Sequence, residues 1–179
     1  MRYSIFLLIC TFLFSADDKA PRQRTRDRGV DIHHINIDVA VDLVEKSVSG
    51  NVTHTLSPFN SSLSEFELDA EDMEIHRVIL DGKDISYNHH GDKVFLSLNK
   101  PIGWEDTVKV RLDYTAHPRK GTFFIAPDSV YPGKPWQAWT QGEDTDNHHW
   151  VPLYDYPNDR STFEVKLTVN QRYSALSNG

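Results

Sequence analysis

The residues best suited to chemistry lie in one stretch of this chain, residues 136–163. It holds three of the chain's four tryptophans, together with a run of acids and two adjacent histidines. Tryptophan and tyrosine side chains combine a large apolar area with a polar edge. The carboxylates of Glu143, Asp144 and Asp146 add negative charge beside them. This mixture is typical of the wall of a binding cleft, and neither a core strand nor a solvated loop requires it.

The spacing of the histidines does not predict a metal site. The nine histidines include three adjacent pairs, and no two of them are separated by two or four positions. Neighbours in a strand point to opposite faces, so an adjacent pair chelates a metal poorly. His148 or His149 beside Asp144 or Asp146 is the one combination that could form a site; solvated or hydrogen-bonding histidines are the alternative. We therefore expect no metal ligands in this chain.

One set of residues in this stretch has a distinctive order and spacing. Its members are Thr140, Gln141, Gly142 and Glu143, then Asn147, Trp150, Pro152, Tyr154, Asp155, Pro157, Thr162 and Phe163. The set resembles the segment that closes the N-terminal domain of the aminopeptidase N family of zinc exopeptidases. Leu153 is a departure, because a cysteine is common there in the family.

The resemblance implies a role for two of these side chains. A free α-amine has a pKa of about 7.7 to 8.0 and is largely protonated near neutral pH, so a fixed carboxylate can hold it by a charge-assisted hydrogen bond. By the resemblance, Glu143 binds the N-terminus of a peptide substrate and Gln141 lines the pocket for its first side chain. The alternative is that Glu143 is one more acid in a solvated turn with Asp144 and Asp146.

The resemblance also implies a zinc-dependent aminopeptidase with a catalytic domain after this one. Zinc in that domain would activate a water molecule, and its ligands would come from a His-Glu-x-x-His sequence. This chain contains no such sequence. The chain alone is therefore expected to be inactive, with the downstream catalytic domain as its partner. A non-catalytic secreted β-sandwich that serves as a binding or scaffold module is the other hypothesis.

Residues 1–16 have the composition of a secretory signal peptide. Arg2 precedes an apolar run at residues 5–14, and the small residues Ser15 and Ala16 follow it. The run is shorter than the roughly 20 residues that a membrane-spanning helix requires. We predict a cleaved signal, a flexible linker at residues 17–30, and a mature protein that is secreted or periplasmic and has no membrane span.

Composition excludes several other functions. With 26 acidic and 19 basic residues the formal charge is −7, which repels phosphate backbones, so nucleic acid is not an expected partner. Cys10 is the only cysteine and lies in the expected signal, so the mature chain would have no thiol nucleophile and no disulfide. A Gly-x-Ser-x-Gly sequence is missing as well. No catalytic residue is expected.

Alternating apolar residues predict an all-β domain at residues 31–179. The alternation is clearest at residues 35–43, a return strand follows at 48–56, and further short strands continue to residue 114. We predict an antiparallel sandwich or saddle-like domain, with a long connection at residues 121–135 and strands at 163–169 and 173–176. The final Asn178-Gly179 is typical of a hairpin turn, so the domain is expected to be truncated at its C-terminal end.

Overall fold

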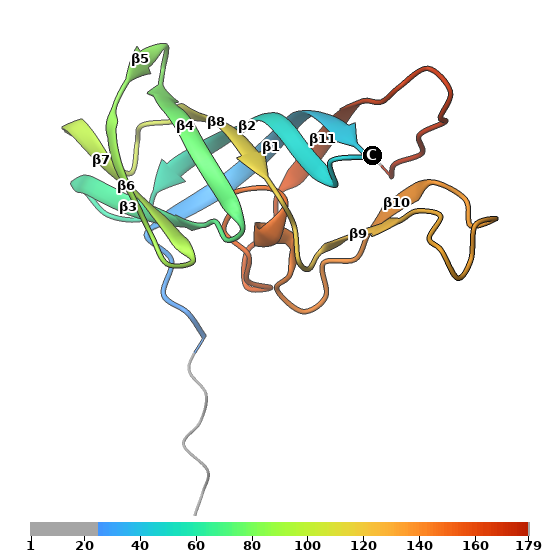
Figure 1. Cartoon of the computed structure of the whole chain (residues 1–179). Coiled ribbons are helices and arrows are strands. Elements are labelled where there is room, and N and C mark those ends of the chain that lie inside the picture. Colours follow the sequence, from blue (N-terminus) through green and yellow to red (C-terminus); the bar gives the residue numbers. More distant parts are fainter. Residues whose placement is uncertain (1–24, 179) are drawn as a thin grey trace, which may run out of the picture.

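The computed structural model describes residues 25–178, which form a domain built almost wholly from β-strands (Figure 1). A six-stranded sheet has the order β11-β1-β2-β8-β4-β5, a three-stranded sheet has the order β3-β7-β6, and β9 pairs with β10 in a two-stranded ribbon. The strands are β1 (Val30–Asp42), β2 (Ser47–Pro58), β3 (Leu63–Asp69), β4 (Met73–Leu80), β5 (Lys83–Asp84), β6 (Ser86–His90), β7 (Lys93–Ile102), β8 (Val108–Ala116), β9 (Thr122–Ile125), β10 (Gln137–Thr140) and β11 (Thr162–Thr168). The expected all-β class is confirmed.

The two larger sheets share one hydrophobic core. Along β8, the residues at even positions are buried, from Val108 to Ala116, while Lys109 and Arg111 between them are exposed. The buried aliphatic and aromatic residues of β2, β3 and β7 belong to the same cluster. A period of two is what a strand with one buried face requires, and it is why these strands were readable from the sequence.

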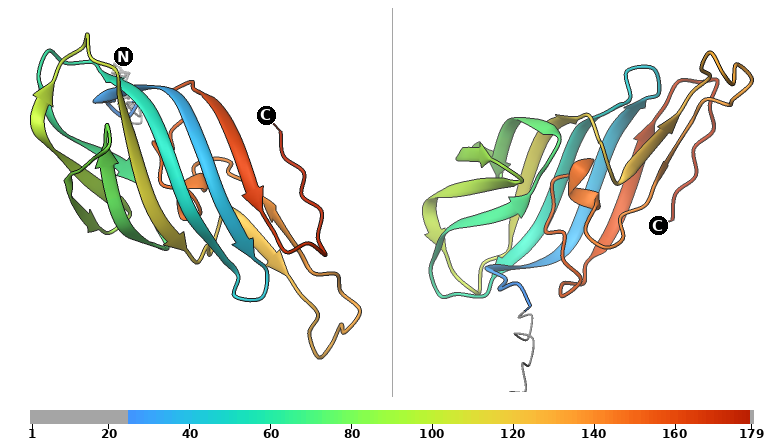
Figure 2. Two further views of the ribbon diagram at one scale, coloured as in Figure 1. Left: turned by 90° about the horizontal axis from the view of Figure 1, so that it is seen from above. Right: turned by 60° about the horizontal axis from the view of Figure 1, so that its bottom comes forward.

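Two parts of the fold differ from the prediction. Residues 122–125, expected in a long connection, form β9 and pair antiparallel with β10, where Trp139 lies opposite Phe123. Residues 173–176 were expected to form a strand, which is wrong, because the described chain after β11 contains no further strand. This segment lies beside the ribbon instead (Figure 2).

The last strand also enters the sheet in an unexpected direction. β11 lies at the sheet edge parallel to β1, with Val165 opposite Ile37, whereas every other pairing of the described strands is antiparallel. The chain reaches β11 by a long loop that passes beneath the six-stranded sheet, between the three-stranded sheet and the ribbon (Figure 1). This loop carries η1 (Asn147–His149), a turn of 3-10 helix and the one helical element among residues 25–178.

The expected signal at residues 1–16 lies outside the described residues, as do most of the expected linker and Gly179. The last part of that linker is held against the domain. Arg26 donates hydrogen bonds to Asp69 at 2.5 and 2.8 Å and to Glu67 at 2.6 Å, and Arg28 pairs with Asp159. Among the described residues there is no helix with the length and apolar character needed to cross a membrane.

Candidate functional site

The two residues expected to bind substrate lie in the loop between β10 and η1. The ribbon holds the start of this loop, because the backbone N–H of Gln141 donates to the carbonyl of Gly121 at 2.8 Å. The loop then turns back on itself, with the N–H of Asp146 donating to the carbonyl of Gly142 at 3.1 Å. A Cβ atom at Gly142 would lie 2.1 Å from the side chain of Asn147. A larger residue at this position would have to displace the amide group of Asn147.

The side chains of Gln141 and Glu143 are both exposed. Within residues 25–178 no hydrogen bond or ion pair joins either side chain to another residue. Beside them, Trp139 is 45% exposed and its ring stacks on that of Phe123 at 4.5 Å between centroids. The arrangement presents a carboxylate and an amide to solvent next to an aromatic surface. It can therefore accept hydrogen bonds from a cationic ligand without first breaking an internal pair.

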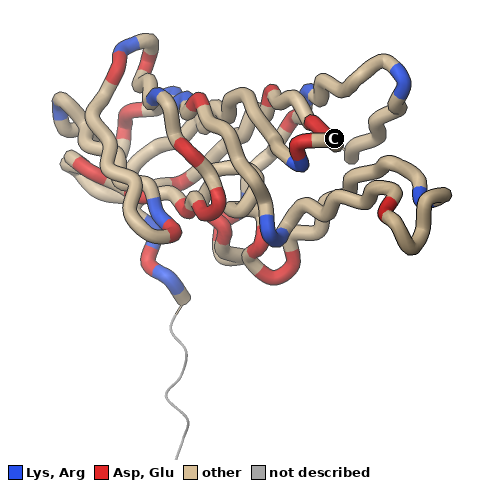
Figure 3. The backbone as a smooth tube through the Cα atoms, viewed as in Figure 1, with Lys and Arg blue, Asp and Glu red and all other residues tan. Residues whose placement is uncertain are grey.

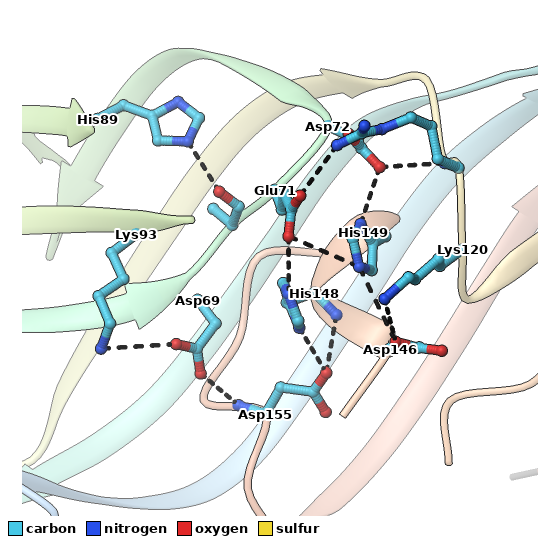
Figure 4. Close-up of polar contacts among 12 residues, drawn as sticks. Asp69, Glu71, Asp72, His89, Lys93, Lys120, Asp146, His148, His149 and Asp155 are labelled. Carbon is cyan, nitrogen blue, oxygen red and sulfur yellow. Dashed lines mark hydrogen bonds and ion pairs between the residues drawn. The ribbon is translucent and has the colours of Figure 1, made fainter. Parts of the chain in front are cut away.

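A buried polar network holds the loop from behind (Figure 4). His148 lies in η1, and its Nδ1 and its backbone N–H are both within hydrogen-bond distance of Oδ2 of Asp155, at 2.9 and 3.0 Å. The hydrogen bond with this carboxylate raises the pKa of His148. Asp155 is itself fixed, because its backbone N–H donates to Oδ2 of Asp69 at 2.9 Å. The network thereby joins η1 to the end of β3.

The second histidine of η1 contacts the turn between β3 and β4. His149 is almost completely buried, and its Nδ1 lies 2.8 Å from Oδ2 of Asp72. Burial would raise the pKa of Asp72, but hydrogen bonds from Arg119 and His149 outweigh burial and lower it. Arg119 donates to Oδ1 of Asp72 at 2.6 Å, so each carboxylate oxygen has its own partner.

The strand-based argument against adjacent histidines is wrong for this pair. Because His148 and His149 lie in a 3-10 turn, their rings stack at 4.5 Å between centroids instead of pointing to opposite faces. The carboxylate that faces both of them belongs to Glu71, and Asp146 reaches His149. Asp144 is exposed and joins no part of the network. Glu71 and Asp72 carried no local signal in the sequence, since they are some 77 residues from the histidines.

An apolar hollow of about 630 Å³ opens beside the loop. Its walls come from β1 and β11, the ribbon, the loop itself and the segment after β11, and they include Trp139, Trp150 and Phe163. Phe163 is 42% exposed and Leu176 is 99% exposed, so this apolar surface is open to solvent in the described chain. Tyr154, in contrast, belongs to the core.

Fold and site together define a β domain that displays a carboxylate on a braced loop beside an open apolar surface. Residues 31–179 match the family described as the Peptidase M1 N-terminal domain, so the chain belongs to the M1 zinc metallopeptidases, the aminopeptidase N family. The resemblance inferred from the sequence is confirmed.

Relatives of this family share the fold over only part of their length. The chain is 24% identical to an M1 zinc metallopeptidase from Deinococcus radiodurans, with a TM-score of 0.68, and the match covers 82% of this chain and 34% of that one. A mutant of the same enzyme bound to a Tyr-Ser-Ala substrate is 25% identical, with a TM-score of 0.67 and coverages of 81% and 34%. Yeast LTA4 hydrolase in complex with bestatin is 17% identical, with a TM-score of 0.68 and coverages of 79% and 23%. Aminopeptidase B of Mus musculus is 23% identical over 90 residues, which are 50% of this chain and 14% of that protein.

Proposed function

We propose that this chain is the N-terminal, substrate-anchoring part of an exported zinc-dependent aminopeptidase that removes N-terminal amino acids from peptides. In the proposal, Glu143 accepts hydrogen bonds from the α-ammonium group of the substrate, and Gln141 lines the pocket for the first side chain. The catalytic zinc would lie in a following domain. Its expected His-Glu-x-x-His sequence does not occur in this chain, so no step is assigned to zinc here.

The proposal rests on one observation: within residues 25–178, the carboxylate of Glu143 has no hydrogen-bond or ion-pair partner. Most acids around the loop are already engaged, for example Asp72 with Arg119 and Asp155 with His148. Glu143 is exposed and makes no such contact within residues 25–178. A carboxylate fixed in a turn and left without an internal partner supports a role in binding a cation. The braced loop supports the same role, because a site on a rigid segment loses less entropy when the ligand binds.

The apolar hollow supports a packed neighbour in the complete protein. Exposed aromatic side chains such as Trp136, Trp139 and Phe163 lie near the loop, and large apolar patches of this kind mark interaction surfaces. A following catalytic domain that packs here would cover the hollow and bring its reacting groups close to Glu143. A peptide substrate is the class of ligand that such a domain would process.

The test is Glu143→Gln in the complete enzyme. A hydrogen bond to a charged group is worth about 1.5 to 3 kcal/mol, so kcat/KM on peptides with a free amine should fall about 10- to 100-fold. Asp144→Asn, which removes the neighbouring exposed acid, is the matched control and should change kcat/KM little. N-acetylated peptides have no cation to hold, so their weak cleavage should respond much less to Glu143→Gln.

Equal losses on free and acetylated peptides would refute the anchoring role. No peptidase activity in the complete wild-type protein, together with retained binding of a peptide or protein, would instead favour the non-catalytic binding module.

Export is tested separately, by sequencing the N-terminus of the mature protein. The N-terminus of the mature protein should begin at Asp17, after cleavage behind Ala16, and recovery of an uncleaved cytoplasmic form would contradict export.

A further inference from the structure

Four side chains converge beneath the turn between β3 and β4 (Figure 4). Nε2 of His148 lies 3.6 Å from Oε2 of Glu71. Nε2 of His149 lies 3.7 Å from the same oxygen and 3.9 Å from Oδ1 of Asp146. The ligand atoms of Glu71, His148 and His149 all lie within 4.8 Å of one another. We propose that these residues form a zinc site, with Asp146 as the fourth ligand. This proposed zinc site does not depend on the proposal that Glu143 binds an amine.

The separations suit a tetrahedral ion. Zinc bonds to histidine nitrogen and carboxylate oxygen measure about 2.0 to 2.2 Å, which places neighbouring ligand atoms about 3.3 to 3.6 Å apart. The separations of Glu71 from the two histidines and of Asp146 from His149, 3.6 to 3.9 Å, are equal to this spacing or only a few tenths of an ångström longer. The ligand atoms of Glu71, His148 and His149 lie within 4.8 Å of one another and could close around an ion by small movements, whereas Asp146 lies outside this group and would have to turn its carboxylate further towards the ion. Two imidazoles and two carboxylates form a donor set that zinc accepts.

The other nitrogen of each ring is held by a carboxylate. Nδ1 of His148 lies 2.9 Å from Asp155, and Nδ1 of His149 lies 2.8 Å from Asp72. A neutral imidazole that donates its Nδ1 proton presents the lone pair of Nε2, and here both Nε2 atoms face Glu71. Histidine ligands of metals almost always have such a partner, which fixes the ring and raises its basicity. Both histidines are thus oriented as zinc ligands.

The charge around the site also favours a cation. The carboxylates are those of Glu71, Asp72, Asp146 and Asp155, and the basic side chains that contact them are Arg119 and Lys120. With both imidazoles neutral, the four carboxylates and the two basic side chains carry a net charge of −2. A single divalent cation would neutralise this charge. Asp69 and Glu67 next to this group are compensated separately by Arg26 and Lys93. Acidic residues are also visible along the loop that carries η1 in Figure 3.

The basic neighbours leave the ligand atoms accessible. Arg119 contacts Oε1 of Glu71 at 3.0 Å, so Oε2 remains directed at the histidines. Lys120 lies 3.7 Å from Oδ1 of Asp146, but its side chain is 62% exposed and can move away into solvent. The backbone is already in place, because the N–H of Glu71 donates to the carbonyl of His148 at 2.9 Å.

Four protein ligands with no open position are typical of a structural zinc site. An ion here would tie η1 to the turn between β3 and β4. It would therefore brace the loop that carries Gln141 and Glu143, and metal binding would stabilise the domain by mass action.

Isothermal titration of the chelator-treated chain with Zn²⁺ alone tests the site. We expect one Zn²⁺ per chain, a rise in the melting temperature on adding Zn²⁺, and a visible Co²⁺ spectrum of tetrahedral type. Glu71→Gln keeps the shape of a half-buried side chain and should weaken Zn²⁺ binding tenfold or more, while circular dichroism shows that the variant is folded. Asp146→Asn should weaken it as well.

Glu74→Gln is the matched control. Glu74 is an exposed carboxylate on β4 that lies 3.7 Å from a single histidine, His76, so its loss should leave Zn²⁺ affinity unchanged. Absence of stoichiometric Zn²⁺ binding would overturn the proposal. Equal affinities for the wild type and the folded Glu71→Gln variant would overturn it too.

Discussion

His54 should make the stability of this domain depend on pH between about 6.5 and 4. Its side chain is fully buried in the core face of β2, where Nε2 donates to the carbonyl of Pro152 at 2.9 Å and Nδ1 has no partner among the described residues. Burial lowers the pKa of His54 to about 4, against an opposing effect of the hydrogen bond to Pro152. In the unfolded chain the pKa returns to about 6.5.

The sign and size of the effect follow from the two pKa values. As pH falls from 6.5 towards 4, the unfolded chain takes up a proton on His54 that the folded chain does not, so the unfolded state gains stability. The contribution is fully present above pH 6.5 and is lost at about 1.4 kcal/mol per pH unit. By pH 4, where the folded protein begins to protonate as well, about 3 kcal/mol has been lost.

Urea unfolding of the wild type and of His54→Gln across this range measures the effect. Glutamine does not titrate, and its amide can donate to the carbonyl of Pro152, so the variant separates titration from the hydrogen bond. The difference in unfolding free energy between the two proteins should shrink, or reverse, as pH falls from 6.5 to 4. His33→Gln, at an exposed histidine, is the control and should follow the wild type. A difference that stays constant with pH would refute the reasoning.

Two further predictions concern folding. Gly121 has a φ of +70°, and a Cβ atom there would lie 1.9 Å from the carbonyl oxygen of Asp146, so Gly121→Ala should cost more than 2 kcal/mol of stability; Gly82→Ala, at a φ of +82° in open space, should cost about 1 kcal/mol. Thermal unfolding of both variants checks this, and equal costs would contradict it. Arg26→Ala leaves the nearly buried carboxylate of Asp69 with Lys93, at 3.8 Å, as its one remaining cation among the described residues and should cost about 2 kcal/mol, whereas Arg77→Ala, in an exposed pair, should cost clearly less. Similar urea midpoints for the two arginine variants would show that the difference in burial does not matter.

The family and the main strands could be predicted because their signals are local. A strand with one buried face must repeat apolar residues with a period of two, as β1, β2, β7 and β8 do, and this period is visible without any knowledge of the partner strand. The set of residues from Thr140 to Phe163 is equally local, since a single continuous segment closes the domain. The roles of Gln141 and Glu143 remain predictions that rest on this set.

The arrangement of the remaining elements depended on contacts between distant segments. β9 and β10 are only four residues each and pair across an intervening loop, so neither shows a period long enough to recognise. β11 lies parallel to β1 because the loop before it crosses beneath the sheet, and the length of a loop does not reveal its path. Glu71 and the two histidines of η1 are the clearest case. If the adjacent histidines lay in a strand, their side chains would point to opposite faces. They lie in a 3-10 turn instead, where their rings stack. Tertiary packing then places the carboxylate of Glu71, from the turn after β3, opposite both rings.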